Sequence, residues 1–352
     1  MTQIKIQTDG RAGCPFFLAL ICLWASSCLV GCSPAPDQKS DSGRIQVCTS
    51  LYPLYDFTKR IAGDTADVVN LIPPGIEVHD WEPDPRDMVR LNHADLFVYN
   101  GLGMERWAEK VIESMKGKPL AVCLASEGVK PRAGGCERDH GKEADKDDAE
   151  HGPHGDHGDH DSHGDHVDHA NCGIHQWDPH VWLSPKNAAV MLANIRDALI
   201  QIAPENKALY EANYQKAADQ CAQLDAEFRA ALGPDAPLAS RDIVVSHQAF
   251  GYLCQDYGLN QISIEGLAAD SEPTPARMAE IIDEAKQKQI RVIFFEELAD
   301  DRLSQTIAQS CGARVDVLNP YGGLTKQQIA AGDDYFTVMR RNLAALKRAL
   351  QK

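Results

Sequence analysis

Residues 243–264 read IVVSHQAFGYLCQDYGLNQISI, and they hold the pattern from which the fold can be inferred. The stretch 243–246 is a short β-branched run typical of a buried strand, and residues 261–264 form a second such run. Residues 248–257 between them have the length and composition of a helix. Strands that alternate with helices in this way are typical of a parallel sheet with helices on its faces, so we expect an α/β fold.

The same alternation continues on both sides of this stretch. Further strands are predicted at residues 45–51, 68–72, 95–99, 120–124, 291–295 and 315–318, and further helices at residues 55–62, 84–91, 104–116, 274–288, 301–310 and 333–350. Residues 185–232 are purely helical in composition, and Pro204 can open a helix that continues from Glu205 to Leu232. We therefore expect two parallel-sheet α/β lobes, residues 44–203 and 233–352, joined by a long rigid helix at residues 204–232.

The composition limits the class of protein. With 352 residues, of which 43% are hydrophobic, the chain can bury one large core or two medium ones, which argues against a disordered or fibrous protein. The formal net charge of −16 has the wrong sign for binding nucleic acid or docking broadly on an anionic membrane.

The first 43 residues have the features of an export signal. Lys5 and Arg11 precede the apolar stretch 15–30, which is too short to span a bilayer as a stable helix. It ends in LVGC, which resembles the bacterial lipoprotein box, so we expect cleavage before Cys32 and lipidation of that residue. An ordinary signal peptide is the alternative. Residues 33–43 then form a flexible tether, and the protein is expected outside the cytoplasm, attached to a bacterial membrane by its lipid alone.

Export makes disulfide bonds possible, and seven cysteines follow Cys32. An odd number leaves at least one thiol unpaired within the chain, and the sequence does not fix the connectivity. Cys136 and Cys172 flank a low-complexity insert and are candidates for a pair across its base. Cys254 and Cys311 are a second candidate pair.

The insert, residues 137–171, is rich in His, Asp and Gly and has no core-forming pattern. Imidazole and carboxylate groups on such a backbone suit Zn²⁺ and related transition metals, so we expect loose binding of several ions. The histidines of this auxiliary metal loop and its C-terminal flank are His140, His151, His154, His157, His160, His163, His166, His169 and His175.

Three other histidines lie in ordered surroundings. His79 and His180 are in proline-bounded loops, and His247 directly follows the strand at residues 243–246. In open α/β sheets, ligands bind at the carboxyl ends of the strands, where these loops are expected. Three neutral imidazoles favour Zn²⁺ over Mg²⁺, Ca²⁺ and Mn²⁺, which prefer oxygen-rich sites.

Several motifs resemble one known family. The strings GIEVHDWEPDPRDMVRLNHADLFVYNGLGME, DPHVWLSP, VVSHQAFGYLCQDYGL, LNPYGGLT and GDDYFTVMRRNL are similar, in order and spacing, to the ZnuA-type zinc and manganese substrate-binding proteins of bacterial ABC transporters. The resemblance implies two lobes joined by a long helix, with one divalent metal held between them and delivered to a membrane permease. It also implies that His79, His180 and His247 are the metal ligands. The His-rich insert is more typical of the zinc branch than of the manganese branch.

One position departs from the family pattern. Relatives often have LNPLEGLT where this chain has LNPYGGLT, and the carboxylate they carry there is replaced by Gly322. A fourth ligand must then come from elsewhere. The alternatives are water, an insert histidine, or one of the carboxylates Glu77, Asp316, Glu296 and Glu297. Asp80 and Asp178, each close in sequence to a ligand histidine, are candidates to hold the second ring nitrogen of that histidine; the alternative is that they only cap local turns.

Two other functions remain open at this point. Three protein ligands with an open fourth position are also the arrangement of a zinc hydrolase, although the chain has neither an HExxH nor a GxSxG motif. A surface metal buffer or adhesin would instead use the insert and need the lobes only as a scaffold. The preferred prediction is a monomeric zinc receptor, not an enzyme, that works with an ABC permease.

Overall fold

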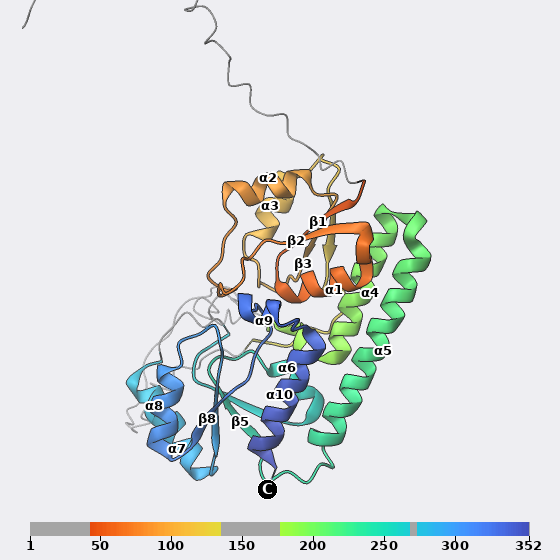
Figure 1. Cartoon of the computed structure of the whole chain (residues 1–352). Coiled ribbons are helices and arrows are strands. Elements are labelled where there is room, and N and C mark those ends of the chain that lie inside the picture. The colour runs from red at the N-terminus through yellow and green to blue at the C-terminus, as the bar shows by residue number, and fades with distance from the viewer. Residues whose placement is uncertain (1–42, 135–176, 268–272, 352) are drawn as a thin grey trace, which may run out of the picture. The chain divides into compact units, whose positions relative to one another are not determined.

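The computed structural model describes residues 43–134, 177–267 and 273–351, and residues 44–352 belong to one compact unit (Figure 1). The predicted signal segment with Cys32, the tether, the Cys136–Cys172 pair and the nine histidines of the auxiliary metal loop lie outside the described residues. Among the described residues, no helix is both long enough and apolar enough to cross a membrane.

The first half of the chain forms a four-stranded parallel sheet in the order β2-β1-β3-β4. Its strands are β1 (Ile45–Thr49), β2 (Ala66–Asn70), β3 (Leu96–Tyr99) and β4 (Ala121–Leu124). The helices of this lobe are α1 (Tyr52–Ala62), α2 (Pro85–His93) and α3 (Ala108–Ser114). Val47 pairs with Val68 on one side and with Leu96 on the other, which places β1 in the middle of the sheet.

The second half repeats this arrangement, with a parallel sheet in the order β6-β5-β7-β8. Its strands are β5 (Asp242–Val245), β6 (Asn260–Ser263), β7 (Val292–Phe295) and β8 (Arg314–Val317). Its helices are α6 (Gly251–Tyr257), α7 (Pro275–Gln287), α8 (Arg302–Cys311), α9 (Lys326–Ala330) and α10 (Tyr335–Leu350). The prediction of two parallel-sheet α/β lobes is confirmed. In each sheet the chain reverses direction of winding beside the first strand, which creates the crevice where ligands of such sheets bind.

The helical stretch between the sheets is two helices, α4 (Pro185–Ile202) and α5 (Lys207–Leu232), separated by a 3₁₀ turn at Pro204–Asn206. The helix predicted to start at Glu205 therefore starts slightly later, because Pro204 opens the turn and not the helix itself. Near its start, α5 places the Tyr210 hydroxyl 2.9 Å from Thr65 of the first lobe. Near its end, Phe228 stacks on Tyr257 of the second lobe.

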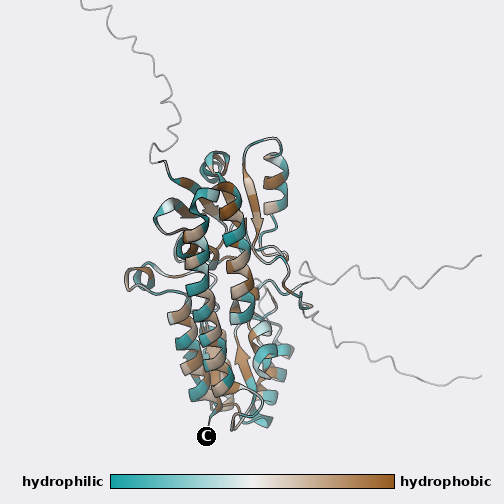
Figure 2. Cartoon of the chain, turned by 90° about the vertical axis from the view of Figure 1, so that its right-hand side faces the viewer, coloured by the Kyte–Doolittle hydropathy of each residue, from teal (hydrophilic) through white to brown (hydrophobic). Residues whose placement is uncertain are grey.

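Helix α5 thus contacts both lobes, and Figure 1 shows it running past both sheets. In Figure 2 the two long helices that face the viewer carry brown and teal residues along the same length, as expected for helices that bury one face. Because residues 44–352 form one compact unit, the exact division into lobes 44–203 and 233–352 with a linker at 204–232 stays a prediction.

The second sheet separates two apolar clusters. Ile243 and Val245 of β5 contact the main cluster, and Val244 between them faces a smaller cluster on the other side. Cys254 belongs to the main cluster and Cys311 packs against the smaller one, and both are free cysteines. The predicted Cys254–Cys311 disulfide is therefore wrong, because the sheet lies between the two thiols.

The main apolar cluster is continuous from the first lobe to the second. It includes Phe57 of α1, Trp182 of the connecting segment, and Phe250, Phe294 and Tyr335 of the second lobe, all of them buried. The largest apolar cluster therefore spans both lobes, and each lobe has one smaller cluster of its own among the described residues.

A polar network beside this cluster joins α1 to the second lobe. The Asp56 carboxylate accepts hydrogen bonds from the Tyr321 hydroxyl at 2.9 Å and from the Tyr335 main-chain N–H at 2.9 Å. Arg60 pairs with Asp56 at 2.8 Å and with Asp334 at 2.6 Å. The mostly buried Asp56 carboxylate therefore accepts hydrogen bonds from residues of both lobes.

We predict that Asp56→Ala destabilises the protein by on the order of 2 kcal/mol, because it leaves several buried donors without their acceptor. The control is Glu211→Ala, which removes an exposed pair with Lys207 on α5 and should change stability by at most about 0.5 kcal/mol. Urea unfolding of both variants measures the difference. Equal stability of the two variants would contradict a structural role for the network.

Candidate metal centre

His79 lies in the loop between β2 and α2, which is held at several points. The Glu77 carboxylate accepts a hydrogen bond from the Val78 N–H at 2.9 Å and closes a tight local turn. The N–H of Gly75 donates to the Leu324 carbonyl at 3.0 Å, which ties the loop to the second lobe. Beyond His79, the capping box of Asp84 and Asp87 fixes the start of α2. The loop therefore presents His79 at the crevice without regular structure.

His180 is held by the residues on both sides of it. The fully buried Asp178 accepts hydrogen bonds from the His180 N–H at 3.0 Å and from its ring Nδ1 at 3.1 Å. Asn100, at the carboxyl end of β3, donates to the Pro179 carbonyl at 2.9 Å. Trp182 donates its indole N–H to the Pro320 carbonyl of the second lobe at 2.7 Å. His180 itself is 1% exposed, so its ring has one orientation.

His247 follows β5 after one residue, at the carboxyl end of the second sheet. Its Nδ1 lies 2.5 Å from the carboxylate of Glu296, which directly follows the neighbouring strand β7. The Ser246 hydroxyl donates to the same carboxylate oxygen. Adjacency of β5 and β7 in the sheet is what brings this histidine and this carboxylate together.

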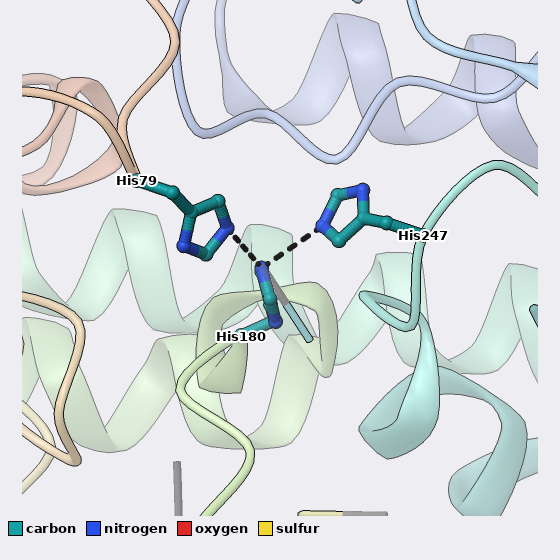
Figure 3. Close-up of side chains that lie close together, drawn as sticks. All are labelled: His79, His180 and His247. Atoms are coloured by element: carbon teal, nitrogen blue, oxygen red, sulfur yellow. Dashed lines mark hydrogen bonds between the residues drawn. The ribbon is translucent and has the colours of Figure 1, made fainter. Parts of the chain in front are cut away.

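The three histidines converge on one point (Figure 3). The Nε2 atom of His180 lies 3.3 Å from that of His79 and 3.2 Å from that of His247. A tetrahedral zinc ion with Zn–N bonds of about 2.05 Å separates two ligand nitrogens by about 3.3 Å. Two of the three separations match this value, and all three ligand atoms lie within 4.8 Å of one another, close enough to hold one small cation. Among the described residues this is the one cluster of at least three His, Cys, Asp or Glu side chains with such a spacing.

The carboxylates also fix which ring nitrogens carry protons. A carboxylate can only accept hydrogen bonds, so the Nδ1 atoms of His180 and His247 are the protonated ones in the neutral rings. The lone pairs of their Nε2 atoms then face each other at 3.2 Å, an arrangement that a cation or a proton between them stabilises. The same carboxylate-to-imidazole bond is typical of histidines that bind metals.

The two buried rings differ in their affinity for protons. Burial lowers the pKa of His180 below its usual value in spite of the nearby Asp178 carboxylate. Burial also opposes protonation of His247, but the negative charges of Glu296 and Glu77 outweigh it, so the pKa of this ring is raised. In turn, burial alone would raise the pKa of Glu296, and the His247 ring reverses that effect and lowers it.

Residues of both lobes line the pocket around the histidines, and they decide between the candidates for a fourth ligand. Glu77 lines the pocket, where burial and the charge of Glu296 raise its pKa. Glu297 also lines it but accepts a hydrogen bond from Asn319 at 2.7 Å. Asp316 is not among the residues that line this pocket and pairs with Arg348 at 2.9 Å, which argues against it as a fourth ligand.

Glu296 has another role than the predicted one of fourth ligand, since it holds the outer nitrogen of His247. Glu296 was a candidate because it directly follows a predicted strand. The sequence could not show that this strand lies beside the strand that precedes His247. The Asp178 carboxylate accepts a hydrogen bond from the His180 ring, whereas Asp80 is exposed, and the roles of both beside a bound metal stay predictions. Gly322 and Val78 both line the pocket, and a Cβ atom added at Gly322 would lie 3.3 Å from a methyl group of Val78. A side chain at position 322 would therefore lie at the pocket.

Comparison with known proteins gives consistent results. Residues 47–349 match the family model described as zinc-uptake complex component A, periplasmic (ZnuA). The chain is 38% identical over 314 residues to the high-affinity zinc uptake system protein ZnuA of Bacillus subtilis (strain 168), which covers 89% of each chain. It is 37% identical over 329 residues to the zinc-binding lipoprotein AdcA of Streptococcus pneumoniae (strain ATCC BAA-255 / R6). That match covers 93% of this chain but only 60% of the AdcA chain.

Solved structures agree with the sequence relatives. The Zn(II)-bound ZnuA-like domain of S. pneumoniae AdcA superposes with a TM-score of 0.69 at 32% identity, covering 88% of this chain and 100% of that one. The laminin-binding protein Lbp of Streptococcus pyogenes superposes with a TM-score of 0.68 at 27% identity, covering 88% of this chain and 100% of that one.

We predict that replacing His79, His180 or His247 by Ala strongly weakens the tight binding of a divalent metal. The loss should exceed the roughly 10–100-fold that is typical when a residue hydrogen-bonded to a metal ligand is removed. Each change removes one of few ligands from a preformed site. The control is His93→Ala on α2, outside the pocket lining, which should keep the wild-type affinity. Competition with a chelator measures all four variants, and near-wild-type zinc affinity in any two of the three pocket variants would refute the assignment.

We also predict a pH dependence of metal affinity. Because the pKa of His247 is raised above the usual value of about 6.5, protons already compete with the metal near neutral pH. Affinity should be highest above about pH 8, fall through neutrality, and fall more steeply once His180, whose pKa is lowered, also binds protons. Chelator competition from pH 8.5 to 5.5 measures the profile, and a flat profile would mean that other groups dominate binding.

Proposed function

We propose, on the premise that this chain belongs to the ZnuA family of zinc-uptake components, that it is an extracytoplasmic receptor which binds Zn²⁺ between its two lobes and delivers it to an ABC permease. The observation that carries the proposal is the convergence of three imidazoles on one point, with Nε2 separations of 3.2 and 3.3 Å. His79, His180 and His247 are then the ligands, and the metal is the cargo of the protein.

The donor set favours zinc as this cargo. Neutral imidazoles suit Zn²⁺ and other late transition metals, whereas Mn²⁺ prefers a site with more oxygen atoms. The relatives from B. subtilis and S. pneumoniae are named for zinc uptake and zinc binding, which supports the same choice. We therefore assign Zn²⁺ rather than Mn²⁺ to the site.

Water or Glu77 completes the metal shell in this proposal. Gly322 offers no side chain, Glu296 is engaged with His247, and Glu297 with Asn319. The Glu77 carboxylate is the remaining one in the pocket lining, and it accepts hydrogen bonds from the main-chain N–H groups of Val78 and His79 in its own loop. A site of three imidazoles and one exchangeable ligand can both bind zinc and release it.

The relatives and the first residues of the chain both support export and attachment to a membrane. AdcA of S. pneumoniae is named a lipoprotein, and the chain carries LVGC at residues 29–32, which supports a lipid anchor on Cys32. We propose that the receptor works as an anchored monomer outside the cytoplasm and has no catalytic activity of its own. Binding of zinc without turnover is the expected behaviour.

Adhesion is a second candidate function, and one observation favours it. The fold is shared with Lbp, which is described as laminin-binding, at 27% identity. Metal buffering by the auxiliary metal loop is compatible with either function.

The number of zinc ions bound by the whole protein tests the receptor proposal. We expect one tight zinc ion in the described site and several weaker ones in the auxiliary metal loop, because the composition of that loop is too polar to form a core, so part of the binding free energy is lost in ordering the backbone. Isothermal titration of the full chain and of a variant without residues 137–171 should show that only the weaker ions are lost.

The other outcomes separate the alternatives. Loss of nearly all zinc capacity on deletion would favour a metal buffer, and loss of the tight ion alone would make an insert histidine the fourth ligand. Zinc-dependent cleavage of ester or peptide substrates would favour a hydrolase instead. Retention of one tight ion without turnover is the outcome that supports the receptor.

A further inference from the structure

Arg132 lies behind the metal centre, at the outer side of Asp178. Its guanidinium Nη1 atom donates to the Asp178 Oδ2 atom at 3.2 Å. The other oxygen of this carboxylate, Oδ1, accepts hydrogen bonds from the N–H and from the ring Nδ1 of His180. Arg132, Asp178 and His180 therefore form a continuous chain of polar contacts that ends at the Nε2 atom facing the metal position.

Both oxygens of the Asp178 carboxylate are used in this chain, which gives the group a single orientation. The side chain of Asp178 is 0% exposed, and that of Arg132 is 30% exposed. A buried carboxylate is stable only when its charge is compensated and its oxygens are hydrogen-bonded. Without the guanidinium, Asp178 would lose the cation at Oδ2, and the plane of its carboxylate would be free to rotate away from His180.

The main chain reinforces the same contact. The Asp178 N–H donates to the Arg132 carbonyl at 2.8 Å, and the hydroxyl of Tyr252 accepts from the Arg132 N–H at 2.9 Å and donates to the Asp178 carbonyl at 3.2 Å. An isolated β-bridge joins Ala133 to Trp177 beside them. Arg132 and Asp178 thus stay together although more than forty residues separate them in the sequence.

The start of helix α6 packs directly against the Arg132–Asp178 pair. A Cβ atom added at Gly251 would overlap both the guanidinium of Arg132 and the Oδ2 atom of Asp178. The absence of a side chain at this position is what allows the two groups to meet against the helix. Three separate elements, namely the segment before residue 135, the segment after residue 176 and α6, converge on one ion pair.

We propose that Arg132 is a positioning residue for zinc binding: it holds the Asp178 carboxylate in the orientation that aims the Nε2 atom of His180 at the metal. The inference rests on the proposed function and names a residue that affects the same site without touching the metal. Outer partners of metal-binding histidines typically change metal affinity by about 10–100-fold, and a residue one contact further out belongs at the lower end of that range.

The test compares three variants of the full chain by zinc competition and by the visible absorption spectrum of bound Co²⁺. Arg132→Met removes the charge but keeps an unbranched stem, and should weaken tight binding about tenfold and change the Co²⁺ spectrum. Arg132→Lys should restore both, within about threefold in affinity, because the contact uses a single nitrogen that an ammonium group can replace. Arg340→Met, which breaks a comparable pair with Glu227 far from the pocket, is the matched control and should resemble the wild type.

Gly251→Ala provides a second route to the same result without a change of charge. Its methyl group should displace the Arg132–Asp178 pair and weaken zinc binding in the same direction. The auxiliary metal loop is present in every variant, so its weaker sites cancel in the comparison. Thermal unfolding of each metal-free variant records any loss of stability separately.

Unchanged zinc affinity and an unchanged Co²⁺ spectrum in Arg132→Met would overturn the proposal. Equal losses in the Met and Lys variants that parallel their melting temperatures would also overturn it, since they would show a purely structural role. Absence of a tight site in the wild type would instead refute the proposed function, and with it the inference. Tight wild-type binding together with a normal Arg132→Met variant would refute the inference alone.

Discussion

The candidate metal centre depends on two carboxylate-to-imidazole hydrogen bonds, from His180 to Asp178 and from His247 to Glu296. Each bond keeps a proton on the outer ring nitrogen and leaves a lone pair on the inner one. Two such lone pairs at 3.2 Å repel each other, and the fold holds them there because both rings are buried and cannot turn away. The energy of packing the lobes thus maintains a site whose electrostatics favour a cation.

A comparison of the two sheets shows how His247 comes to lie beside a buried glutamate. In both lobes a serine follows the central strand and donates to a buried glutamate, Ser50 to Glu105 in the first and Ser246 to Glu296 in the second. The residue after the serine is Leu51 in the first lobe, and burial raises the pKa of Glu105. In the second lobe that residue is His247, whose ring lowers the pKa of Glu296. The serine–glutamate hydrogen bond thus occurs in both lobes. It becomes part of the candidate metal centre in the second lobe because the next residue is His247 and not a leucine.

Much of the site could be predicted from the sequence, and the rest depended on facts that only the fold supplies. Three histidines in separate loops were identifiable, because strand ends and prolines are local signals, and Asp178 is only two residues from its partner. The sequence could not show that Glu296 holds the His247 ring and is not itself a metal ligand, because that contact depends on which strands are neighbours. The predicted Cys254–Cys311 pair is wrong because no local signal showed that the helices carrying these cysteines pack against different apolar clusters, on opposite faces of the second sheet. The sequence could not exclude Asp316 either, since period-2 alternation shows that strand residues face opposite sides but not which side faces the crevice.

The shared apolar cluster restricts how the crevice can open. Phe57, Trp182 and Tyr335 belong to one continuous core, so a wide rotation of the lobes would expose it to water at about 25 cal/mol for each Å² of apolar surface. Exposure of only a few hundred Å² would already consume several kcal/mol, a large part of the stability of an ordinary domain. A wide opening of the crevice would therefore cost a large part of the stability of the fold, which favours entry and release of a metal through changes confined to the rim of the crevice.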